Sequence, residues 1–524
     1  MNILAASNTY DEVAYPTQPV WHSHPAHVGA ISTLFGMQPQ PANRSRVLEL
    51  GCATGGNLIP MAERFPDGTF VGIDYSRVQI ETARQVSTAL GLTNLQLLHA
   101  SIADLGDALG KFDYIVCHGV YSWVARDLQH KILEFCRAAL NPQGVAYVSY
   151  NVYPGWHLRS IFRRLMCEQA KQSTSTQRQM AEGRTLLELL SRTVTREDWP
   201  YGKILKAEID AILNHQSGYL FHEYLEPDNE PIYFHEFDAR ATAAGLRYLG
   251  DAVPPSMFAV NALPASESHL RRVTHDAIAL EQYWDVLKNR GFHQTLLCHR
   301  EISPSGCLQP QRLEGLYFRG DFTPRGAAPD FKSSAPATFT FRGGRTVIQR
   351  PPPVKAVLYH LGRQWPRAVN LDSLIDAVGN LIAAGGPGAD SPAVLREQIV
   401  QIVVEAVARG LIDPTSVPDD FITSISSRPA ASPLARLQAE TSNKVTNRRH
   451  ERVELDEGTR AMLRFLDGRH DHGALLDALV AAMACGEVTA PPNFAASGAP
   501  DPDTLAMVLK TWLTSIANQA LLIA

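Results

Sequence analysis

The sequence lacks the marks of secreted and membrane-spanning proteins. Its 524 residues include seven scattered cysteines without a C-x-x-C pair, which argues against a disulfide framework and against a structural zinc site. No apolar run reaches the roughly 18 residues that a membrane span requires. Residues 1–13 also lack the basic and apolar regions of a signal peptide. We therefore expect a cytoplasmic protein that does not insert into a membrane.

A basic excess is also missing. The 48 Lys and Arg residues are outnumbered by 53 Asp and Glu residues, which gives a net charge of −5. Proteins that bind nucleic acid through its phosphates usually carry positive charge, so we expect no nucleic-acid partner. Hydrophobic residues make up 45% of the chain, and its length suggests three or four domains with buried cores.

A glycine-rich loop lies between two predicted strands near the N-terminus. The apolar run 47–50 predicts a strand, the loop G-C-A-T-G-G-N follows at residues 51–57, and apolar residues at helical spacing begin at Leu58. A second strand at 69–73 then ends in Asp74. This unit is typical of a site for a nucleoside-bearing cofactor. Its glycines let the ligand approach the backbone, and the acid accepts hydrogen bonds from ribose hydroxyls.

The acidic residue Glu49, just before the loop, helps to decide which nucleoside binds. A dinucleotide site expects G-x-G-x-x-G, and a buried carboxylate would repel a pyrophosphate. The same carboxylate would attract the sulfonium and α-amino groups of S-adenosylmethionine (SAM). The pattern E-L-G-x-x-x-G-x-N at residues 49–57 resembles motif I of class I SAM-dependent methyltransferases. A Rossmann-like loop for NAD or another nucleotide is the alternative.

This resemblance implies a set of cofactor-binding residues. The loop would cradle the methionine end, Asp74 would hold the ribose, and Ser101 and Ile102 would flank the adenine, with Asp104 near its amino group. The expected cofactor-binding residues are Glu49, Gly51, Cys52, Ala53, Thr54, Gly55, Asn57, Asp74, Tyr75, Ser101, Ile102 and His118. S-adenosylhomocysteine would be the product, and no metal is expected.

Strands and helices alternate from residue 46 to residue 150. A third strand is predicted at 94–99, a fourth at 112–117, a helix at 127–140 that ends at the turn Asn141-Pro-Gln-Gly144, and a fifth strand at 144–149. Such alternation predicts an α/β fold with a parallel, doubly wound sheet. Ligands bind at the carboxyl ends of strands in these sheets, so the residues that follow the fourth and fifth strands are candidates for the acceptor site.

Aromatic and polar residues gather at those two strand ends. Methyl transfer requires an aligned acceptor and the exclusion of water, and aromatic rings suit a cationic amine through cation–π contact. The motif [DN]-P-P-[YFW] of many nucleic-acid base methyltransferases is missing after the fourth strand, which reads C-H-G-V-Y-S-W. Packing of the rings under a lid is the alternative. The expected catalytic residues are His118, Tyr121, Asn151, Tyr153 and Trp156.

Further segments resemble one family, the methyltransferases that carry a methyltransferase regulatory domain. That family includes rickettsial-type protein lysine methyltransferases, which act on an outer membrane protein before export. The resemblance spans residues 8–300 and implies SAM dependence. It also implies a protein substrate, such as an envelope protein before export, with lysine as the acceptor. Its motifs lie at residues 10–16, 23–25, 49–62, 149–157, 222–225, 229–237, 244–250 and 290–298.

The expected fold is a Rossmann-like class I methyltransferase sheet with a helical insert, followed by winged-helix-like units. The insert would be a lid or a homodimer contact, and Tyr10, Asp11 and Glu12 would form a flap over SAM. The expected boundaries are 1–45 for the lead-in, 46–160 for the SAM-binding core, 161–217 for the insert, 218–300 for the regulatory segment that completes the core, and 301–415 and 440–524 for the winged-helix-like units.

Two stretches in the C-terminal third each predict helix, turn, helix. Their second helices carry Asp372, Asp376 and Asp477 where a DNA reader needs basic or amide residues, so a protein contact or scaffold is expected. The basic run 444–452 is interpreted as a solvated linker or as a contact for an acidic partner.

Three histidines near the N-terminus, His22, His24 and His27, suggest a metal site at first sight. They have no fourth ligand nearby, and Pro25 interrupts any helix. His24 is therefore interpreted as a capping or substrate-side residue.

These patterns predict a SAM-dependent methyltransferase acting on protein lysine. Two alternatives stay open. One is a methyltransferase for a small molecule, with the C-terminal units serving assembly. The other is a non-catalytic SAM sensor that signals through those units.

Overall fold

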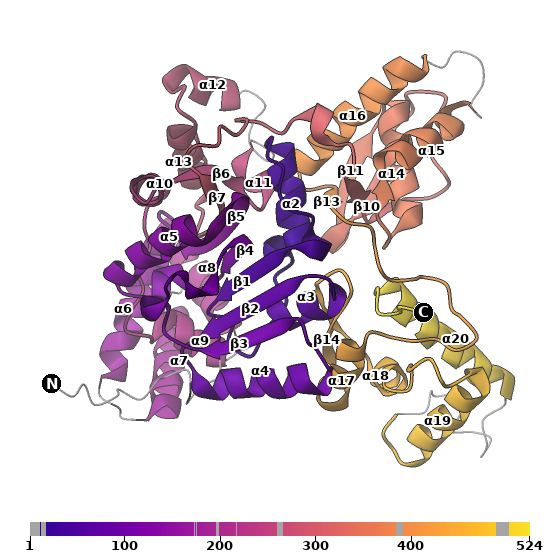
Figure 1. Ribbon diagram of the computed structural model, residues 1–524, viewed down its shortest axis with the longest axis horizontal. Coiled ribbons are helices and arrows are strands. Elements are labelled where there is room, and N and C mark those ends of the chain that lie inside the picture. The colour runs from indigo at the N-terminus through magenta and orange to yellow at the C-terminus, as the bar shows by residue number, and fades with distance from the viewer. Residues whose placement is uncertain are drawn as a thin grey trace.

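The computed structural model describes most of the chain (Figure 1). A sheet domain lies at the centre, helices 6–9 extend from one side, and two C-terminal units lie on the other side. The described residues are 11, 17–171, 173, 175–194, 199–215, 217–258, 266–383, 391–488 and 502–524.

A seven-stranded sheet has the order β3-β2-β1-β4-β5-β7-β6. Strands β1 to β5 run parallel, and β7 pairs antiparallel with both β5 and β6. The expected Rossmann-like sheet is therefore confirmed. Its strands are β1 (Arg46–Leu50), β2 (Thr69–Asp74), β3 (Leu95–His99), β4 (Phe112–Cys117), β5 (Leu140–Asn151), β6 (Leu246–Asp251) and β7 (Phe292–His299).

Both faces of the sheet are buried, which explains the apolar runs of its strands. Alternate residues belong to two different clusters of buried side chains: Val47 faces one cluster and Leu48 the other. Helices α2 and α3 supply the first cluster, and α5 and α10 the second. The helices of the sheet domain are α2 (Pro25–Leu34), α3 (Leu58–Arg64), α4 (Arg77–Ala89), α5 (Arg126–Ala139), α10 (Phe234–Ala243), α11 (Pro254–Met257), α12 (Ser266–Val273) and α13 (Ala277–Lys288).

Strand β5 begins earlier than the sequence predicts. Asn141-Pro-Gln-Gly144 is predicted as a turn, yet Leu140 already pairs with Phe112, and Asn141 Nδ2 donates to Asp113 Oδ1 at 2.7 Å. A register shift between Phe112 and Tyr114 accommodates the extra residues, including Pro142. Pairing with β4 therefore extends the strand through a sequence that looks like a turn.

A helical insert follows β5, as expected, and has its own core. Phe162, Met166, Leu187 and Ile209 pack together there. Its first helix begins at Trp156, before the predicted start of the insert at residue 161. Its helices are α6 (Trp156–Ala170), α7 (Thr176–Thr193), α8 (Pro200–Leu213) and α9 (Ser217–Tyr224).

The first C-terminal unit shares a core with the sheet domain. Phe318, Leu361 and Val403 lie in the same buried cluster as Val28 and Leu34 of α2. Helix α2 therefore joins the unit to the sheet by apolar packing. The elements of the unit are β8 (Tyr317–Arg319), β9 (Phe322–Pro324), β10 (Ala337–Phe341), β11 (Arg345–Gln349), α14 (Pro352–Gln364), β12 (Val369–Asn370), α15 (Leu371–Ala383), α16 (Pro392–Ala408) and β13 (Asp413–Thr415).

The second C-terminal unit has a separate core, in which Leu463, Leu475, Leu513 and Ile516 are buried. Figure 1 shows its β14 beside α3, whereas α19 lies far from the sheet. The helices that the structure describes include none with the length and apolarity to cross a membrane. The elements of the unit are α17 (Pro433–Thr441), β14 (Lys444–Thr446), β15 (Arg452–Glu454), α18 (Glu457–Leu463), α19 (His472–Ala484) and α20 (Pro502–Asn518).

Candidate active site

The glycine-rich loop curls over the carboxyl end of β2. The amides of Gly51 and Cys52 both donate to the carbonyl oxygen of Ile73, at 2.8 and 3.0 Å. Gly51 has a φ of +75°, and a Cβ there would lie 2.4 Å from a methyl carbon of Val120. Both its conformation and its close neighbour therefore require glycine. The turn leaves the loop backbone at the strand ends, where ligands bind in such sheets.

Asp74 is held at the end of β2 by two backbone donors. Its Oδ2 accepts from the amide of Ala53 and its Oδ1 from the amide of Ser76, each at 2.8 Å. Burial raises the pKa of Asp74, and these two donors oppose that rise. Each carboxylate oxygen retains acceptor capacity for a ribose hydroxyl. Next to it, Tyr75, another expected cofactor-binding residue, is 68% exposed.

The predicted flap touches this end of β2. Asp11 accepts a hydrogen bond from the Ser76 hydroxyl, next to Asp74. Tyr10 and Glu12, its expected companions, lie outside the described residues. The contact places Asp11 beside the predicted ribose site.

Glu49 is a buried carboxylate with one oxygen to spare. It is 4% exposed, and its Oε1 accepts from Asn57 Nδ2 at 2.7 Å. Within the described chain its Oε2 is buried without a hydrogen-bond partner. Burial raises the pKa of Glu49 to about 7, although the bond from Asn57 lowers it. A buried acceptor of this kind fits the ammonium group of a ligand, because burial without a partner is costly.

Asn57 does not face the methionine end as the sequence predicts. Its Oδ1 accepts from the Val20 amide at 2.8 Å and lies 2.7 Å from His450 Nε2. Its Nδ2 donates to Glu49 and to Ser23 Oγ. The amide is thus fully used by protein partners. Asn57 therefore orients Glu49, and its own amide has no free group for a ligand.

Two other loop side chains also face protein. Cys52 is buried in a cluster with Ile59 and Leu434, and Thr54 Oγ1 lies 2.5 Å from Thr17 Oγ1. Because both side chains contact protein, the predicted role of these residues in cofactor binding would fall to their backbone groups.

The predicted adenine segment follows β3. The hydroxyl of Ser101 accepts from the Ala103 amide at 3.2 Å and so caps the 3₁₀ turn Ile102–Asp104. Ile102 packs partly against the buried cluster under α5 and is otherwise open. Asp104 is exposed. Ile102 keeps an accessible apolar surface for the adenine, whereas the hydroxyl of Ser101 serves the turn.

His118 follows β4 and lies in a polar cluster. Its Nδ1 is 3.0 Å from Tyr147 Oη and 3.2 Å from Ser149 Oγ, and Tyr147 Oη donates to Gln294 Oε1 at 2.7 Å. Burial lowers the pKa of His118 to about 4, so the ring is neutral at pH 7. A neutral imidazole can orient a polar acceptor group by hydrogen bonding.

The exit of β5 is joined by a segment far along the chain. Asn151 Nδ2 donates to Asn229 Oδ1 at 3.1 Å, and the Ile232 amide donates to the carbonyl oxygen of Asn151 at the same distance. The amide of Tyr153 donates to the carbonyl oxygen of Ile232. Residues 229–232 therefore line the exit, a role that sequence reasoning missed because nothing local indicates this pairing.

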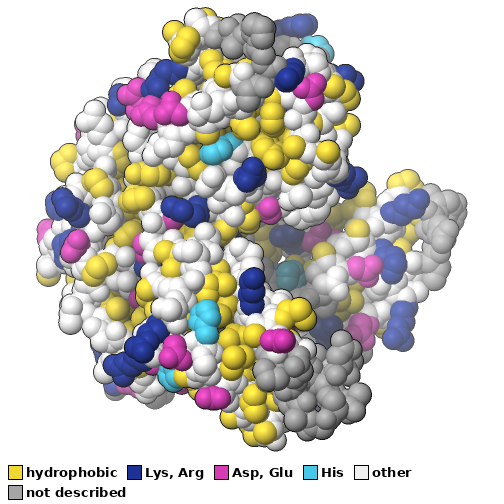
Figure 2. Space-filling view, turned by 90° about the vertical axis from the view of Figure 1, so that its right-hand side faces the viewer, with side chains coloured by type: hydrophobic (Ala, Val, Ile, Leu, Met, Phe, Trp, Pro, Cys, Tyr) yellow, Lys and Arg dark blue, Asp and Glu magenta, His cyan; other side chains and the backbone are white. Residues whose placement is uncertain are grey.

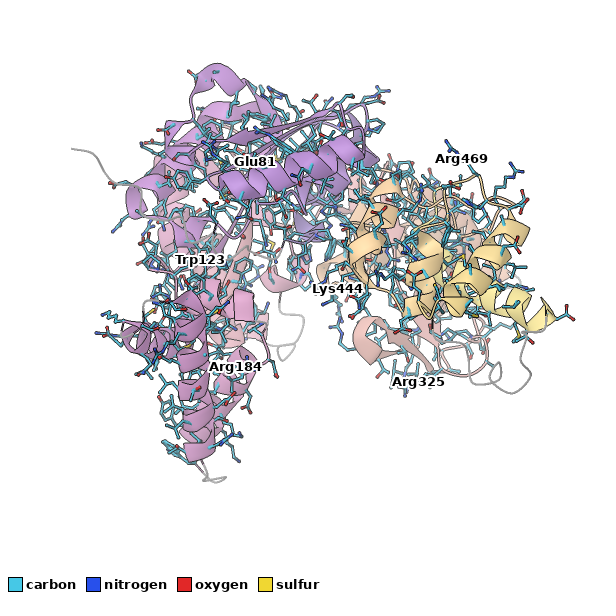
Figure 3. All side chains as sticks on the ribbon, turned by 90° about the horizontal axis from the view of Figure 1, so that it is seen from below. Glu81, Trp123, Arg184, Arg325, Lys444 and Arg469 are labelled. Atoms are coloured by element: carbon cyan, nitrogen blue, oxygen red, sulfur yellow. The ribbon has the colours of Figure 1, made fainter. Side chains whose placement is uncertain are left out.

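The predicted ring set separates into three environments. Tyr121 is fully buried between Tyr150 and Phe237, so it belongs to the core and does not line an acceptor site. Trp156 is also buried, 6.3 Å from Trp123 between ring centroids. Figure 3 labels Trp123 where the sheet domain meets the insert. Tyr153 and Trp123 stay half-buried.

The ring of Tyr153 stacks on a histidine. Its centroid lies 4.3 Å from that of His157, with the two planes 16° apart, and 5.4 Å from that of Tyr233. His157 Nε2 lies 3.1 Å from Tyr233 Oη. These three rings form an accessible aromatic group at the exit of β5.

The N-terminal histidines serve the fold. His24 Nδ1 accepts from the Ala26 amide and caps α2, as the sequence suggests, and His27 Nε2 lies 2.7 Å from the carbonyl oxygen of Ala252. Elsewhere among the described residues, Glu281, Asp285 and His293 bring metal-ligand atom types together. The guanidinium of Arg290 already provides the positive charge there, 2.7 Å from Glu281 and 3.2 Å from Asp285.

The surface is of mixed charge. On the face shown in Figure 2, Lys and Arg side chains are interspersed with Asp and Glu among hydrophobic side chains. Arg448, from the basic run at 444–452, is mostly buried and bonds Glu63 and Asp420 of the same chain. The interpretation of this run as a solvated linker is therefore wrong for Arg448, whose acidic partners belong to the same chain.

Three family models match successive parts of the chain. They are described as methyltransferase domain at residues 42–216, predicted methyltransferase regulatory domain at 216–299, and PKMT, C-terminal winged helix domain at 427–521. An uncharacterized protein of Rickettsia prowazekii is 31% identical over 493 residues, which are 93% of this chain and 88% of the relative. A shorter uncharacterized protein of the same organism is 37% identical over 233 residues, 44% of this chain and 93% of that protein.

The fold is also similar to a solved structure. PKMT2 from Rickettsia typhi in complex with AdoHcy matches with a TM-score of 0.87 and 28% identity, covering 97% of this chain and all of that chain. The glycine-rich loop, the spare oxygen of Glu49 and the carboxylate of Asp74 suit SAM, the methylated form of the AdoHcy in that complex. The chain belongs to the class I SAM-dependent methyltransferases that carry a methyltransferase regulatory domain.

Proposed function

We propose that this enzyme transfers methyl groups from SAM to lysine side chains of a protein substrate. The aromatic group at the exit of β5, with Tyr153 stacked on His157, is the observation that carries the proposal. Such rings attract an ammonium group and its methylated products through cation–π contact. Similarity to PKMT2 and to the PKMT winged helix domain supports a protein acceptor.

The residues of the loop would hold the cofactor by its charged and polar groups. Bound SAM would supply the activated methyl group. Glu49 would accept from its α-amino group, Asp74 would accept from the ribose hydroxyls, and Ile102 would pack against the adenine. When Glu49 is ionised, none of these protein groups has to gain or lose a proton for SAM to bind.

His118 would orient the acceptor amine without removing its proton. A lysine ammonium has an ordinary pKa near 10.4, far above the pKa of about 4 at His118. Proton transfer from one to the other would cost roughly 9 kcal/mol at about 1.4 kcal/mol per pKa unit. The amine would instead lose its proton to water on entering the site, since burial lowers a lysine pKa.

The first test incubates the purified enzyme with methyl-labelled SAM and three fractions of host lysate: soluble proteins, envelope proteins and small molecules. We expect label in a protein band, on lysine, and stable to acid and base. The envelope fraction is included because an envelope protein that meets the enzyme in the cytoplasm before export is the partner we propose. Tyr153→Ala should lower labelling at least tenfold while SAM affinity stays within twofold.

Each other outcome rejects part of the proposal. Label confined to small molecules would assign the site to a metabolite. SAM binding without label in any fraction would favour the non-catalytic sensor. A Tyr153→Ala variant that labels at the wild-type rate would remove the aromatic group from the acceptor site. Tyr359→Ala, a change to a half-buried tyrosine of the first C-terminal unit, is the matched control.

We also propose that the insert forms a homodimer contact. Ile161 and Leu165 of α6, Leu189 of α7 and Ile204 of α8 are exposed apolar side chains. Apolar surface on an insert can be covered by a second copy of the chain. Sedimentation at micromolar concentration should give a dimer, and Leu189→Glu together with Ile204→Glu should give a monomer. A wild-type monomer would contradict the proposal and leave the lid as the role of the insert.

A further inference from the structure

The second C-terminal unit reaches the cofactor loop through the turn between β14 and β15. His450 in this turn is 3% exposed, and its Nε2 lies 2.7 Å from Asn57 Oδ1. Its ring centroid lies 4.8 Å from that of His24. Figure 3 labels Lys444, the first residue of β14, where this unit meets the rest of the molecule.

Two hydrogen bonds link His450 to the carboxylate of Glu49. Asn57 takes the His450 bond on its oxygen, and its Nδ2 donates to Glu49 Oε1 at 2.7 Å. An ionised carboxylate accepts and never donates, so Asn57 must present its nitrogen to Glu49. His450 bonds the opposite end of the amide and so stabilises that orientation. Glu49 Oε1 is then occupied, and Oε2 is left for the ligand.

The protonation of His450 suits this role. Burial lowers its pKa to about 3, with the nearby Arg64 acting in the same direction. The ring is therefore neutral at pH 7 and carries one N–H. That hydrogen must be on Nε2, because Asn57 Oδ1 is an acceptor. The bond is consequently present across the whole neutral pH range.

The turn is fixed to the core beside His450. Arg448 bonds Glu63 of α3, and the Ser432 hydroxyl donates to Glu63 Oε1 at 2.8 Å. Leu434, also from the second unit, packs in the cluster that contains Cys52 of the loop. The second unit therefore contacts both the loop and the helix that follows it. A displacement of the unit would withdraw His450 from Asn57.

We propose that His450 is a positioning residue for SAM, through which the second C-terminal unit completes the cofactor site. With His450 withdrawn, Asn57 Oδ1 keeps the bond from the Val20 amide but loses its second donor, so the amide is held less firmly with its nitrogen toward Glu49. Glu49 would then be held less firmly in its orientation toward the ligand. The affinity for SAM thus depends on the docking of a unit that lies outside the sheet domain.

Two substitutions of similar length test the hydrogen bond in the full-length enzyme. His450→Gln can place an amide N–H near the position of Nε2, whereas His450→Met cannot donate a hydrogen bond. Calorimetry should show that the Met variant binds SAM about tenfold more weakly. This is the effect of losing one hydrogen bond from a network that ends in the carboxylate of Glu49. The Gln variant should stay within about threefold of the wild type.

The pH profile separates positioning from general stability. The bond from Asn57 lowers the pKa of Glu49, so the pH below which SAM affinity falls should move upward in the Met variant. His472→Met is the control, because His472 Nε2 bonds the carbonyl oxygen of Ser426 in the same unit. Unchanged SAM affinity in His450→Met would overturn the proposal. Equal losses in the Gln and Met variants, with an equally lowered Tm, would also overturn it.

Discussion

Asp74→Ala should abolish measurable SAM binding while the protein stays folded. The carboxylate lies at the carboxyl end of β2, fixed by the amides of Ala53 and Ser76. A ribose offers two hydroxyl donors, and each hydrogen bond to a charged acceptor contributes about 1.5–3 kcal/mol. Loss of both bonds corresponds to a loss of affinity of at least about 100-fold. Calorimetric titration with SAM and with S-adenosylhomocysteine measures this directly, because both ligands carry the ribose.

The matched control is Glu81→Ala. Glu81 is an exposed carboxylate on α4, the helix that follows Asp74 (Figure 3). The Glu81→Ala substitution also removes one carboxylate close to the site, but it does not touch the predicted ribose position. We expect wild-type affinity for this variant. Wild-type affinity in Asp74→Ala itself would remove Asp74 from the cofactor site and would reject the ribose assignment.

Glu49→Gln should weaken SAM binding by about 100-fold and stabilise the ligand-free protein above pH 7. The affinity for SAM falls because a glutamine side chain is uncharged. In place of the spare oxygen Oε2 it presents either an amide nitrogen or a neutral oxygen to the ligand ammonium. The stability gain follows because ionising the buried Glu49 costs free energy in the ligand-free protein. Function and stability therefore oppose each other at this residue.

The direction of the pH dependence follows from the pKa of Glu49. Folding raises it from about 4.3 in the unfolded chain to about 7. The ligand-free wild type thus loses stability as the pH rises from about 4 to about 7, and the loss is complete above pH 7. At about 1.4 kcal/mol per pKa unit the gain in Glu49→Gln would be on the order of 4 kcal/mol at pH 8 and below about 1 kcal/mol at about pH 4.5.

SAM binding should show the opposite trend in the wild type. Its affinity should rise as the pH rises through about 7, because the ionised carboxylate attracts the ligand. It should fall again above about pH 8, where an α-amino group loses its proton. Thermal unfolding and calorimetry of both proteins at pH 5, 7 and 8 measure the two trends. Glu134→Gln, a change to an exposed glutamate of α5, is the control. Equal Tm values at pH 8 and equal affinities would contradict the role of Glu49.

Strand and helix positions in the sheet domain could be predicted closely. Strand β4 has the bounds 112–117 that its apolar run indicates, and β2 differs from its prediction by the inclusion of Asp74. Both faces of these strands are buried, so each strand appears as an unbroken apolar run between polar turns. The start of β5 could not be read in this way, because its pairing with β4 continues through Asn141-Pro-Gln-Gly144.

The candidate site could be predicted in part. The spacing of the glycines, Glu49 and Asp74 is local, and the structure places them at adjacent strand ends. The environment of each ring could not be predicted. Tyr121 and Tyr153 both follow a predicted strand, yet Tyr121 lies in the core and Tyr153 lies at the exit of β5. Burial of a side chain depends on which distant element covers it.

The sequence by itself determined the parallel sheet, the glycine-rich loop and the carboxylates that accompany it. These features arise from periodicity and spacing over a few tens of residues, which any chain with that pattern must satisfy. Only the tertiary structure decided that Asn57 serves Glu49 and that His450, 393 positions away in the chain, bonds Asn57. No local pattern records such a contact, because it depends on how distant parts of the chain pack together.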